Sequence, residues 1–128
     1  MDESILIVED NAVMANLLQF NLKRAGFDTV AVSNGASGLE TASERGFDMI
    51  ITDHQLPGLS GIEMCKALRQ LPQYTATPVL LCTAKGLELQ LSTLQEEYGV
   101  TDTLFKPVSP RQLVSAVGDL LSSAIASC

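Results

Sequence analysis

At 128 residues, the chain is long enough to fold around a hydrophobic core without disulfides or a structural metal. Hydrophobic residues make up 46% of it and charged residues 18%, which is typical of a globular protein and excludes a disordered one. The net charge of −7 argues against a nucleic-acid-binding surface, because such a surface needs clustered lysine and arginine and the eight basic residues here are scattered.

Neither the cysteines nor the N-terminus indicates a secreted or membrane protein. The three cysteines have no Cys-x-x-Cys spacing, so we expect reduced thiols in a cytoplasmic chain, with Cys82 inside a strand and Cys128 on a tail. Acidic residues bracket the first apolar run, unlike a signal peptide. No apolar stretch approaches the roughly 18 residues that span a membrane, so we expect no membrane contact.

The first third of the chain alternates between apolar runs and segments with helical spacing. Ser4–Val8 is typical of a buried strand, and Asn11 is a suitable N-cap for a helix that ends at Gly26. The apolar residues of this helix follow helical spacing: Val13, Met14, Leu17, Leu18 and Leu22. A second strand is predicted over 27–32, followed by a small-residue helix over 36–45.

The stretch 47–61 is the most informative part of the sequence. Residues 47–52 are predicted to form a strand that is apolar on both faces, as in a parallel sheet covered by helices on both sides. Turn-forming residues, among them Pro57 and Gly58, then begin a loop. Asp53 therefore follows the carboxyl end of a central strand, where open α/β sheets place their ligand sites.

The second half continues the alternation. Ser60 and Glu63 fit a capping box that opens a third helix ending near 71–72. Ser109 and Pro110 begin a final helix with proline at its first position. Between these helices the sequence predicts a strand over 78–82, a helix with Leu87, Leu91, Leu94 and Tyr98 on one face that ends at Gly99, and a strand over 101–105.

Five strands therefore alternate with five helices, without an internal repeat or a linker. Strict alternation predicts parallel strands joined by right-handed crossovers, with helices on both faces of the sheet. We expect an α/β fold with a doubly wound five-stranded parallel sheet and five helices, a flavodoxin-like three-layer α/β/α sandwich. We expect a single domain over residues 1–128 with its core at about 3–123.

Polar side chains follow four of the strands at their carboxyl ends. They are Glu9 and Asp10 after the first strand, Asp53 after the third, Thr83 after the fourth and Lys106 after the fifth. Because these ends meet at one edge of a parallel sheet, the five groups should converge. Three carboxylates repel one another unless a cation joins them, and Mg²⁺ prefers oxygen ligands. Lysine commonly binds phosphate, so we interpret the group as a phosphoryl-transfer site with Asp53 as the candidate nucleophile.

Four motifs resemble the receiver domain of bacterial response regulators. They are IVEDN at 7–11, TDHQLPGLSGIE at 52–63, CTAK at 82–85 and FKP at 105–107, in the order and spacing of that family. The resemblance implies that Asp53 accepts a phosphoryl group from a sensor histidine kinase or a histidine phosphotransfer protein. It implies a Mg²⁺ site formed by Asp10, Asp53 and the backbone carbonyl of Gln55, with Glu9 acting through a water molecule.

The resemblance also implies roles for residues at the other strand ends. Thr83 would hydrogen-bond one phosphoryl oxygen and Lys106 would pair with another, while the small Ala84 leaves room for the group. The Lys106–Pro107 peptide is similar to one that is usually cis in the family. One departure is Thr103, which stands where the family often has an aromatic residue that couples to the threonine; Phe105 lies on the same strand parity.

The chain is therefore expected to be a phosphorylation-activated switch that catalyses its own phosphorylation and dephosphorylation without being a conventional enzyme. Phosphorylation would change the face formed by the fourth helix, fifth strand and fifth helix, which partners read, and we expect no direct contact with nucleic acid. The alternative is a degenerate receiver that serves as a phosphorylation-independent docking module, and Mg²⁺ binding would distinguish the two.

Two other classes share parts of the pattern. A flavodoxin-type electron carrier has the same fold, but the acidic pair Glu9 and Asp10 has the wrong charge for a flavin phosphate. A haloacid-dehalogenase-type phosphatase needs a second aspartate where Gln55 stands. His54 adjoins Asp53, and we interpret it as a rim residue because the resembling family requires no group there.

Overall fold

The computed structural model of the chain describes residues 3–84 and 90–126. A five-stranded parallel sheet with strand order β2-β1-β3-β4-β5 forms its centre. The strands are β1 (Ser4–Val8), β2 (Asp28–Val32), β3 (Met49–Asp53), β4 (Val79–Thr83) and β5 (Asp102–Phe105). The helices are α1 (Ala12–Arg24), α2 (Gly35–Glu44), α3 (Gly61–Leu68), the 3₁₀ turn η1 (Pro72–Tyr74), α4 (Leu91–Thr93) with the π-helical turn η2 (Leu94–Tyr98), and α5 (Pro110–Ala126). The predicted doubly wound, three-layer fold is confirmed.

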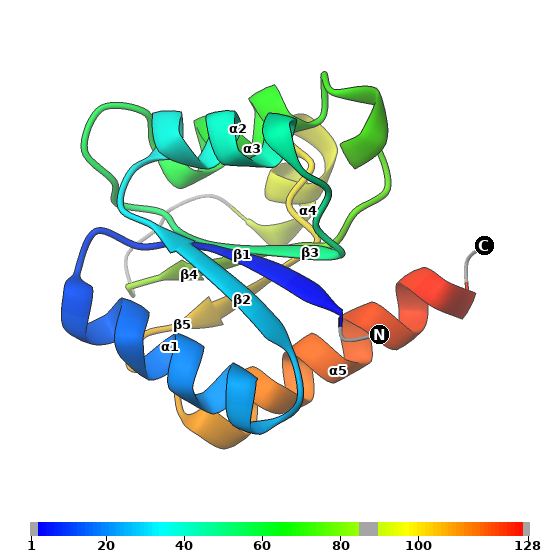
Figure 1. Ribbon diagram of the computed structural model, residues 1–128. Helices are drawn as coiled ribbons and strands as arrows, with labels where there is room; N and C mark the ends of the chain where they lie inside the picture. Colours follow the sequence, from blue (N-terminus) through cyan, green and yellow to red (C-terminus); the bar gives the residue numbers. More distant parts are fainter. Residues whose placement is uncertain (1–2, 85–89, 127–128) are drawn as a thin grey trace.

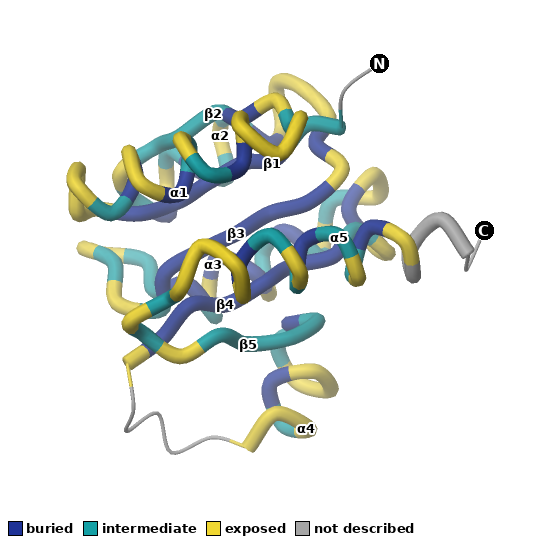
Figure 2. The backbone as a smooth tube through the Cα atoms, turned by 90° about the horizontal axis from the view of Figure 1, so that it is seen from below, coloured by how far each residue is buried: buried dark blue, intermediate teal, exposed yellow. Residues whose placement is uncertain are grey.

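Helices cover both faces of the sheet (Figure 1). Alternate residues of β1 face opposite layers: Ile5 and Ile7 pack with α1 and α5, while Leu6 and Val8 pack with α2, α3 and η2. Figure 2 shows the central strands β1, β3 and β4 buried along most of their length, with β2 and β5 partly exposed at the edges. Each large buried side chain contributes about 1.5–3 kcal/mol, so two apolar layers hold the strands in place.

The ends of the five strands agree with the prediction to within two residues. Two of the strands, β3 and β4, extend one residue further toward their carboxyl ends than predicted. β3 begins at Met49 and includes Asp53, which we had placed in the loop, and β4 continues to Thr83. The reason is strand pairing: Asp53 lies opposite Cys82, and Thr83 lies opposite Phe105. The sheet therefore fixes the backbones of Asp53 and Thr83 directly.

The predicted helix starts are confirmed by their side-chain caps. Asn11 Oδ1 accepts a hydrogen bond from a backbone N–H three residues on, at 3.0 Å. Ser60 and Glu63 make both bonds of a capping box, at 3.3 and 3.1 Å. Ser109 Oγ accepts from the backbone N–H of Gln112 at 3.0 Å. Caps of this kind contribute about 1 kcal/mol each, so the chain enters these helices at defined residues.

Helix α1 buries only part of its apolar surface. Leu18 and Leu22 are buried against the sheet, but Val13, Leu17 and Phe20 are 70%, 52% and 60% exposed. Val13 and Leu17 share the predicted helical spacing with Leu18 and Leu22, so the sequence pattern did not separate the buried face from the exposed one, and Phe20 lies outside the predicted set. The result is an exposed apolar stripe along α1.

The third and fourth helices differ from the prediction. α3 ends at Leu68, earlier than expected, and the chain makes the 3₁₀ turn η1 before β4. The fourth helix is one short α-helical turn followed by the wider turn η2, and it ends as predicted at Gly99, whose φ is +76°. Leu94 is buried and Leu91 is exposed, while the predicted position Leu87 lies outside the described residues.

Two cysteines are buried free thiols. Cys65 lies in α3 and Cys82 in β4, the strand predicted for it. Burial raises the pKa of Cys65 to about 11 and that of Cys82 to about 12, so both stay protonated at neutral pH. Cys128 lies outside the described residues.

Within 3–84 and 90–126, no helix has the length and apolar character needed to cross a membrane.

We predict that Gly61→Ala destabilises the protein by about 2 kcal/mol. A Cβ at Gly61 would press on the carbonyl oxygen of Asp53 and approach its carbonyl carbon and the Cα of His54 at 3.0 Å. The matched variant is Gly118→Ala in α5, where a Cβ would meet no atom within 4 Å. Its higher helix propensity should raise the free energy of unfolding by about 1 kcal/mol. Urea unfolding measures both, and equal free energies of unfolding for the two variants would contradict the close approach.

Candidate functional site

The site lies at the carboxyl edge of the sheet, where backbone hydrogen bonds continue just past the strands. Glu9 N donates to Val32 O at 3.0 Å, and Lys106 N donates to Thr83 O at 2.9 Å. The backbones of both residues are thus fixed by neighbouring strands. Their side chains therefore project from a rigid edge.

Three carboxylates meet at this edge, as the sequence predicted. One oxygen of each of Glu9, Asp10 and Asp53 lies within 4.8 Å of the other two. Glu9 is 3% exposed and Asp53 is 7% exposed, whereas Asp10 is exposed. Like charges at this spacing in a partly buried place repel strongly, so the cluster favours a bound cation.

Lys106 supplies the positive charge that the structure places against this cluster. Its Nζ lies 3.1 Å from Asp53 Oδ1 and 3.2 Å from Glu9 Oε1. Burial disfavours the charged amine, but the hydrogen bonds and negative charges of Asp53 and Glu9 outweigh it and raise the pKa of Lys106. One ammonium against the three carboxylates leaves an excess of two negative charges when all are ionised.

The surroundings of Glu9 disfavour its charged form. Burial raises its pKa, and the negative charge of Asp53 raises it further. The backbone N–H of Asn11, 3.3 Å from Oε2, and the amine of Lys106 act in the opposite direction without cancelling the effect. A cation at this edge would therefore lower the cost of ionising Glu9.

Thr83 lies at the same edge but does not contact the carboxylates. It is buried, and its hydroxyl donates to the carbonyl of Ala84 at 3.2 Å. Phe105 lies beside it in register and is exposed, while Thr103 lies beside Leu81.

Other residues near Asp53 complete the rim. Gln55 is exposed in the loop after β3, and the Lys106–Pro107 peptide is cis, as the resemblance implied.

His54 is partly buried, and its Nδ1 has no hydrogen-bond partner among the described residues. Ser60 lowers the pKa of Glu63 through hydrogen bonds, and His54 adds a smaller effect of the same sign.

A cleft that the sequence pattern does not predict lies beside the acidic cluster. It measures about 370 Å³ between α1 and β2, and its wall includes Glu9, Asp10, Asn16 and Gln19. Asn16 and Gln19 look like ordinary exposed helix residues in the sequence, and only the packing of α1 on the sheet places them on the wall that Glu9 and Asp10 also line.

These features can be compared with known proteins. A family model described as the response regulator receiver domain matches residues 5–118. The chain belongs to this family. Its members include regulators from distant bacteria, so the match by itself identifies no pathway.

Two curated relatives place the receiver domain within longer proteins. The alkaline phosphatase synthesis transcriptional regulatory protein PhoP of Bacillus subtilis is 40% identical over 121 residues, which are 94% of this chain and 49% of that protein. The sensory transduction protein RegX3 of Mycolicibacterium smegmatis is 36% identical over 118 residues, 92% of this chain and 50% of that protein. This receiver thus spans about half the length of the curated relatives it matches.

Solved receivers share the fold over nearly the whole chain. The chemotaxis response regulator CheY4 of Vibrio cholerae superposes with a TM-score of 0.83 at 27% identity, covering 94% of this chain and 99% of that one. A putative response regulator from Chloroflexus aurantiacus gives 0.86 at 32% identity, covering 95% and 99%.

We predict that Glu9→Gln stabilises the metal-free receiver at neutral pH. The pKa of Glu9 in the folded protein lies above the ordinary value of 4.5. Its contribution to the free energy of unfolding is therefore fully present below pH 4.5 and is lost as the pH rises through the folded pKa. Glutamine keeps an oxygen for Lys106 without the charge, so the melting temperature at neutral pH should rise by about 4 °C, equivalent to about 1 kcal/mol.

Calorimetry of both proteins from acid to neutral pH measures this difference in melting temperature. Glu40→Gln is the matched control, because Glu40 is an exposed residue of α2. Millimolar Mg²⁺ should raise the melting temperature of the wild type more than that of Glu9→Gln. The difference in melting temperature between the two proteins should therefore become smaller. The same pH dependence for all three proteins would show that Glu9 carries no such cost.

Proposed function

We propose that this receiver is a phosphorylation-activated switch whose acceptor is Asp53, with Mg²⁺ required for the transfer. The observation that carries the proposal is the position of Asp53: it is nearly buried at the sheet edge, its Oδ1 lies 3.1 Å from Lys106, and it shares a cluster with Glu9 and Asp10. A carboxylate in this setting is a candidate nucleophile beside a fixed positive charge.

The donor set fits Mg²⁺. Asp10, Asp53 and the carbonyl of Gln55 would be its direct ligands and Glu9 would act through water, which supplies the hard oxygens that this ion prefers. The excess of two negative charges supports a divalent ion. When bound, Mg²⁺ would offset the charge of the incoming phosphoryl group and help orient it.

The chain's own residues account for the rest of the transfer. A carboxylate oxygen of Asp53 would form a bond to phosphorus as the phosphorus–nitrogen bond of the donor's phosphohistidine breaks, and the donor keeps its imidazole. Lys106 already lies against Asp53 Oδ1 and would pair with a phosphoryl oxygen. Thr83 would exchange its bond to the Ala84 carbonyl for one to the phosphoryl group.

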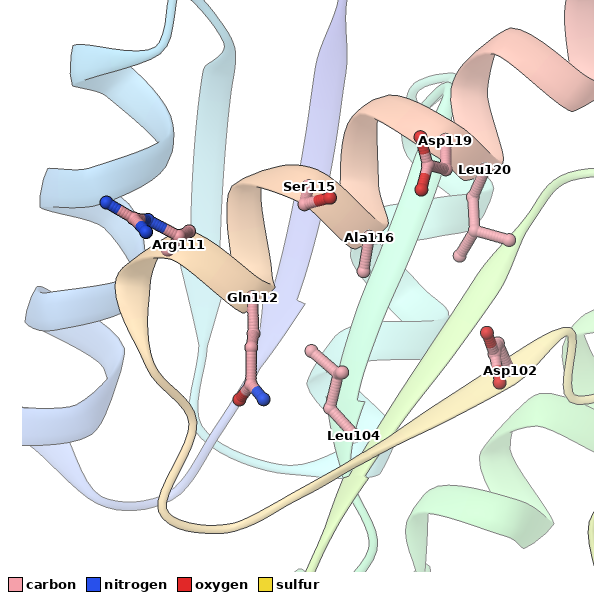
Figure 3. A pocket seen from close by; sticks show the side chains of 8 residues that line it. All are labelled: Asp102, Leu104, Arg111, Gln112, Ser115, Ala116, Asp119 and Leu120. Carbon is pink, nitrogen blue, oxygen red and sulfur yellow. The ribbon is translucent and has the colours of Figure 1, made fainter.

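The output would then pass from Thr83 to the face formed by α4, β5 and α5. A phosphoryl group adds negative charge and three strong acceptors, so Thr83 and the chain after it gain a hydrogen bond by moving inward. A hollow of about 370 Å³ lies on this face between β5 and α5 (Figure 3). Leu104, Ala116 and Leu120 give it apolar walls, with Arg111 and Asp119 at opposite ends, which supports a role in partner contact.

We predict that acetyl phosphate produces a single phosphoryl adduct on the wild type only when Mg²⁺ is present. The adduct should be absent from Asp53→Asn, because the amide is not a nucleophile toward phosphorus. Intact mass measures the adduct, and chelation by EDTA is the control for the metal. A receiver that gives no adduct and does not bind Mg²⁺ would instead support the phosphorylation-independent docking module.

The physiological donor in this proposal is a sensor histidine kinase or a histidine phosphotransfer protein in the cytoplasm. The α1 stripe, defined as Val13, Leu17 and Phe20, supports a protein donor, because it begins three residues after Asp10 and stays exposed. α1 contains no acidic residue and ends in Lys23 and Arg24, so it suits an amphipathic helix with acidic flanks.

We predict that replacing Leu17 and Phe20 together by serine slows transfer from an autophosphorylated histidine kinase core about tenfold, equivalent to about 1.4 kcal/mol of lost contact. The rate with acetyl phosphate should stay the same, since a small donor needs no docking surface. Leu91→Ser removes an exposed leucine from the other layer and is the matched control. Equal loss with both donors would place the defect in the site or the fold.

A further inference from the structure

The two ends of the segment Leu91–Gly99, which comprises α4, η2 and the residue after them, are held very differently. Its first turn, Leu91–Thr93, buries no residue against the protein. Leu94, which follows Thr93 directly, is buried, and so is Val100 just after the segment. Among the described residues, the buried contacts of this stretch therefore lie from Leu94 onward and not in its first turn.

Arg69 is the main clamp on the anchored end. Its Nε and Nη2 donate to the carbonyl of Gly99 at 3.0 and 2.6 Å, and its Nη1 donates to the carbonyls of Tyr74 and Thr77, each at 2.6 Å. Charge-assisted bonds of this kind are among the stronger hydrogen bonds in proteins. Glycine is needed at 99 because its φ is +76° and a Cβ would meet the Cγ of Arg69 at 2.7 Å.

Further contacts fix the same end to the start of β4. Thr101 N donates to Val79 O at 2.9 Å, and Val79 N donates to Thr101 Oγ1 at 2.9 Å. Gln95 Nε2 donates to Thr101 O at 2.9 Å, and Lys66 lies 5.8 Å from the ring centre of Tyr98. The clamped end therefore lies at the amino edge of the sheet, about 13 Å along β4 from Thr83, because each of four steps rises about 3.3 Å.

Helix α3 connects this clamp to the phosphoacceptor. It begins at Gly61, which packs against the carbonyl of Asp53 and whose N–H donates to His54 O at 2.9 Å. It ends at its C-cap, Arg69. The amino end of α3 therefore contacts the proposed acceptor Asp53, and its carboxyl end carries Arg69.

From this asymmetry we propose that Arg69 makes the Gly99 end a fixed pivot, about which Leu91–Thr93 swings when Asp53 is phosphorylated. The inference rests on the proposed function and adds the residue that sets the geometry of the response. Arg69 is a positioning residue: it touches neither the acceptor nor the metal ligands, and it acts through the end of η2. The π-helical turn next to the pivot is a feature often found where helices carry function.

The first test follows backbone amide shifts of the wild type when beryllofluoride and Mg²⁺ are added. We expect shifts at Asp53 and Thr83 and large shifts at Leu91–Thr93. Shifts at Gly99–Thr101 should be at least threefold smaller than those at Leu91–Thr93. Shifts of equal size along the whole segment would overturn the pivot and leave the proposed function intact, whereas no response at Asp53 would overturn both.

The second test removes the clamp by Arg69→Gln, with Arg45→Gln as the matched control for losing a partly exposed arginine. The side chain of Arg45 contacts Asp28 at 3.5 Å and the ring of Phe47, neither of which belongs to Leu91–Gly99. In Arg69→Gln the beryllofluoride response should spread to Gly99–Thr101 and at least double there, while Arg45→Gln should keep the wild-type pattern.

Arg69→Lys retains one charged donor and should restore part of the gradient between the two ends, which a merely structural loss of stability would not do. It also serves if Arg69→Gln fails to fold by circular dichroism. A wild-type gradient in a folded Arg69→Gln, or a gradient in Arg69→Lys no different from that of wild type, would show that Arg69 does not set the pivot.

Discussion

The concentration of negative charge at one edge of the sheet is the constraint on which the rest of the structure depends. Glu9, Asp10 and Asp53 bring oxygens within 4.8 Å of one another, and Lys106 contacts two of them. Such a cluster is stable only if the surrounding fold holds it, because the carboxylates would otherwise separate into water. The raised pKa of Glu9 reflects this cost, which burial causes first and Asp53 increases.

The parallel sheet provides the necessary rigidity. Strands β1 and β3 are buried on both faces, so moving their carboxyl ends apart would disturb two apolar layers at once. Pairing of Asp53 with Cys82 holds the proposed acceptor by its own backbone. An unfavourable charge arrangement therefore persists at the edge, and a bound cation would relieve it. The family match extends over this entire framework, from residue 5 to 118.

Most of the fold and the carboxylate cluster could be predicted because they depend on local patterns and on one rule of topology. Apolar strands, the caps at Asn11 and Ser60, and the shared edge of parallel strands each leave a signal in the sequence. The exposure of Leu17 could not be predicted, since its pattern equals that of Leu18 and only packing separates them. Arg69 left no signal either, because its acceptors are backbone carbonyls, which every residue has.

The unequal anchoring of Leu91–Gly99 follows from what a switch requires. A segment clamped at both ends would resist displacement, and a segment free at both ends would have no fixed point about which to turn. With Arg69, Val79 and Thr101 fixing one end, only the end nearer the proposed acceptor Asp53 in the chain would need to move. Because Leu91–Thr93 buries no residue, its displacement would break few buried contacts and cost little free energy. In the proposed response, the fixed end would convert a small change at Thr83 into a rotation of the surface beside β5.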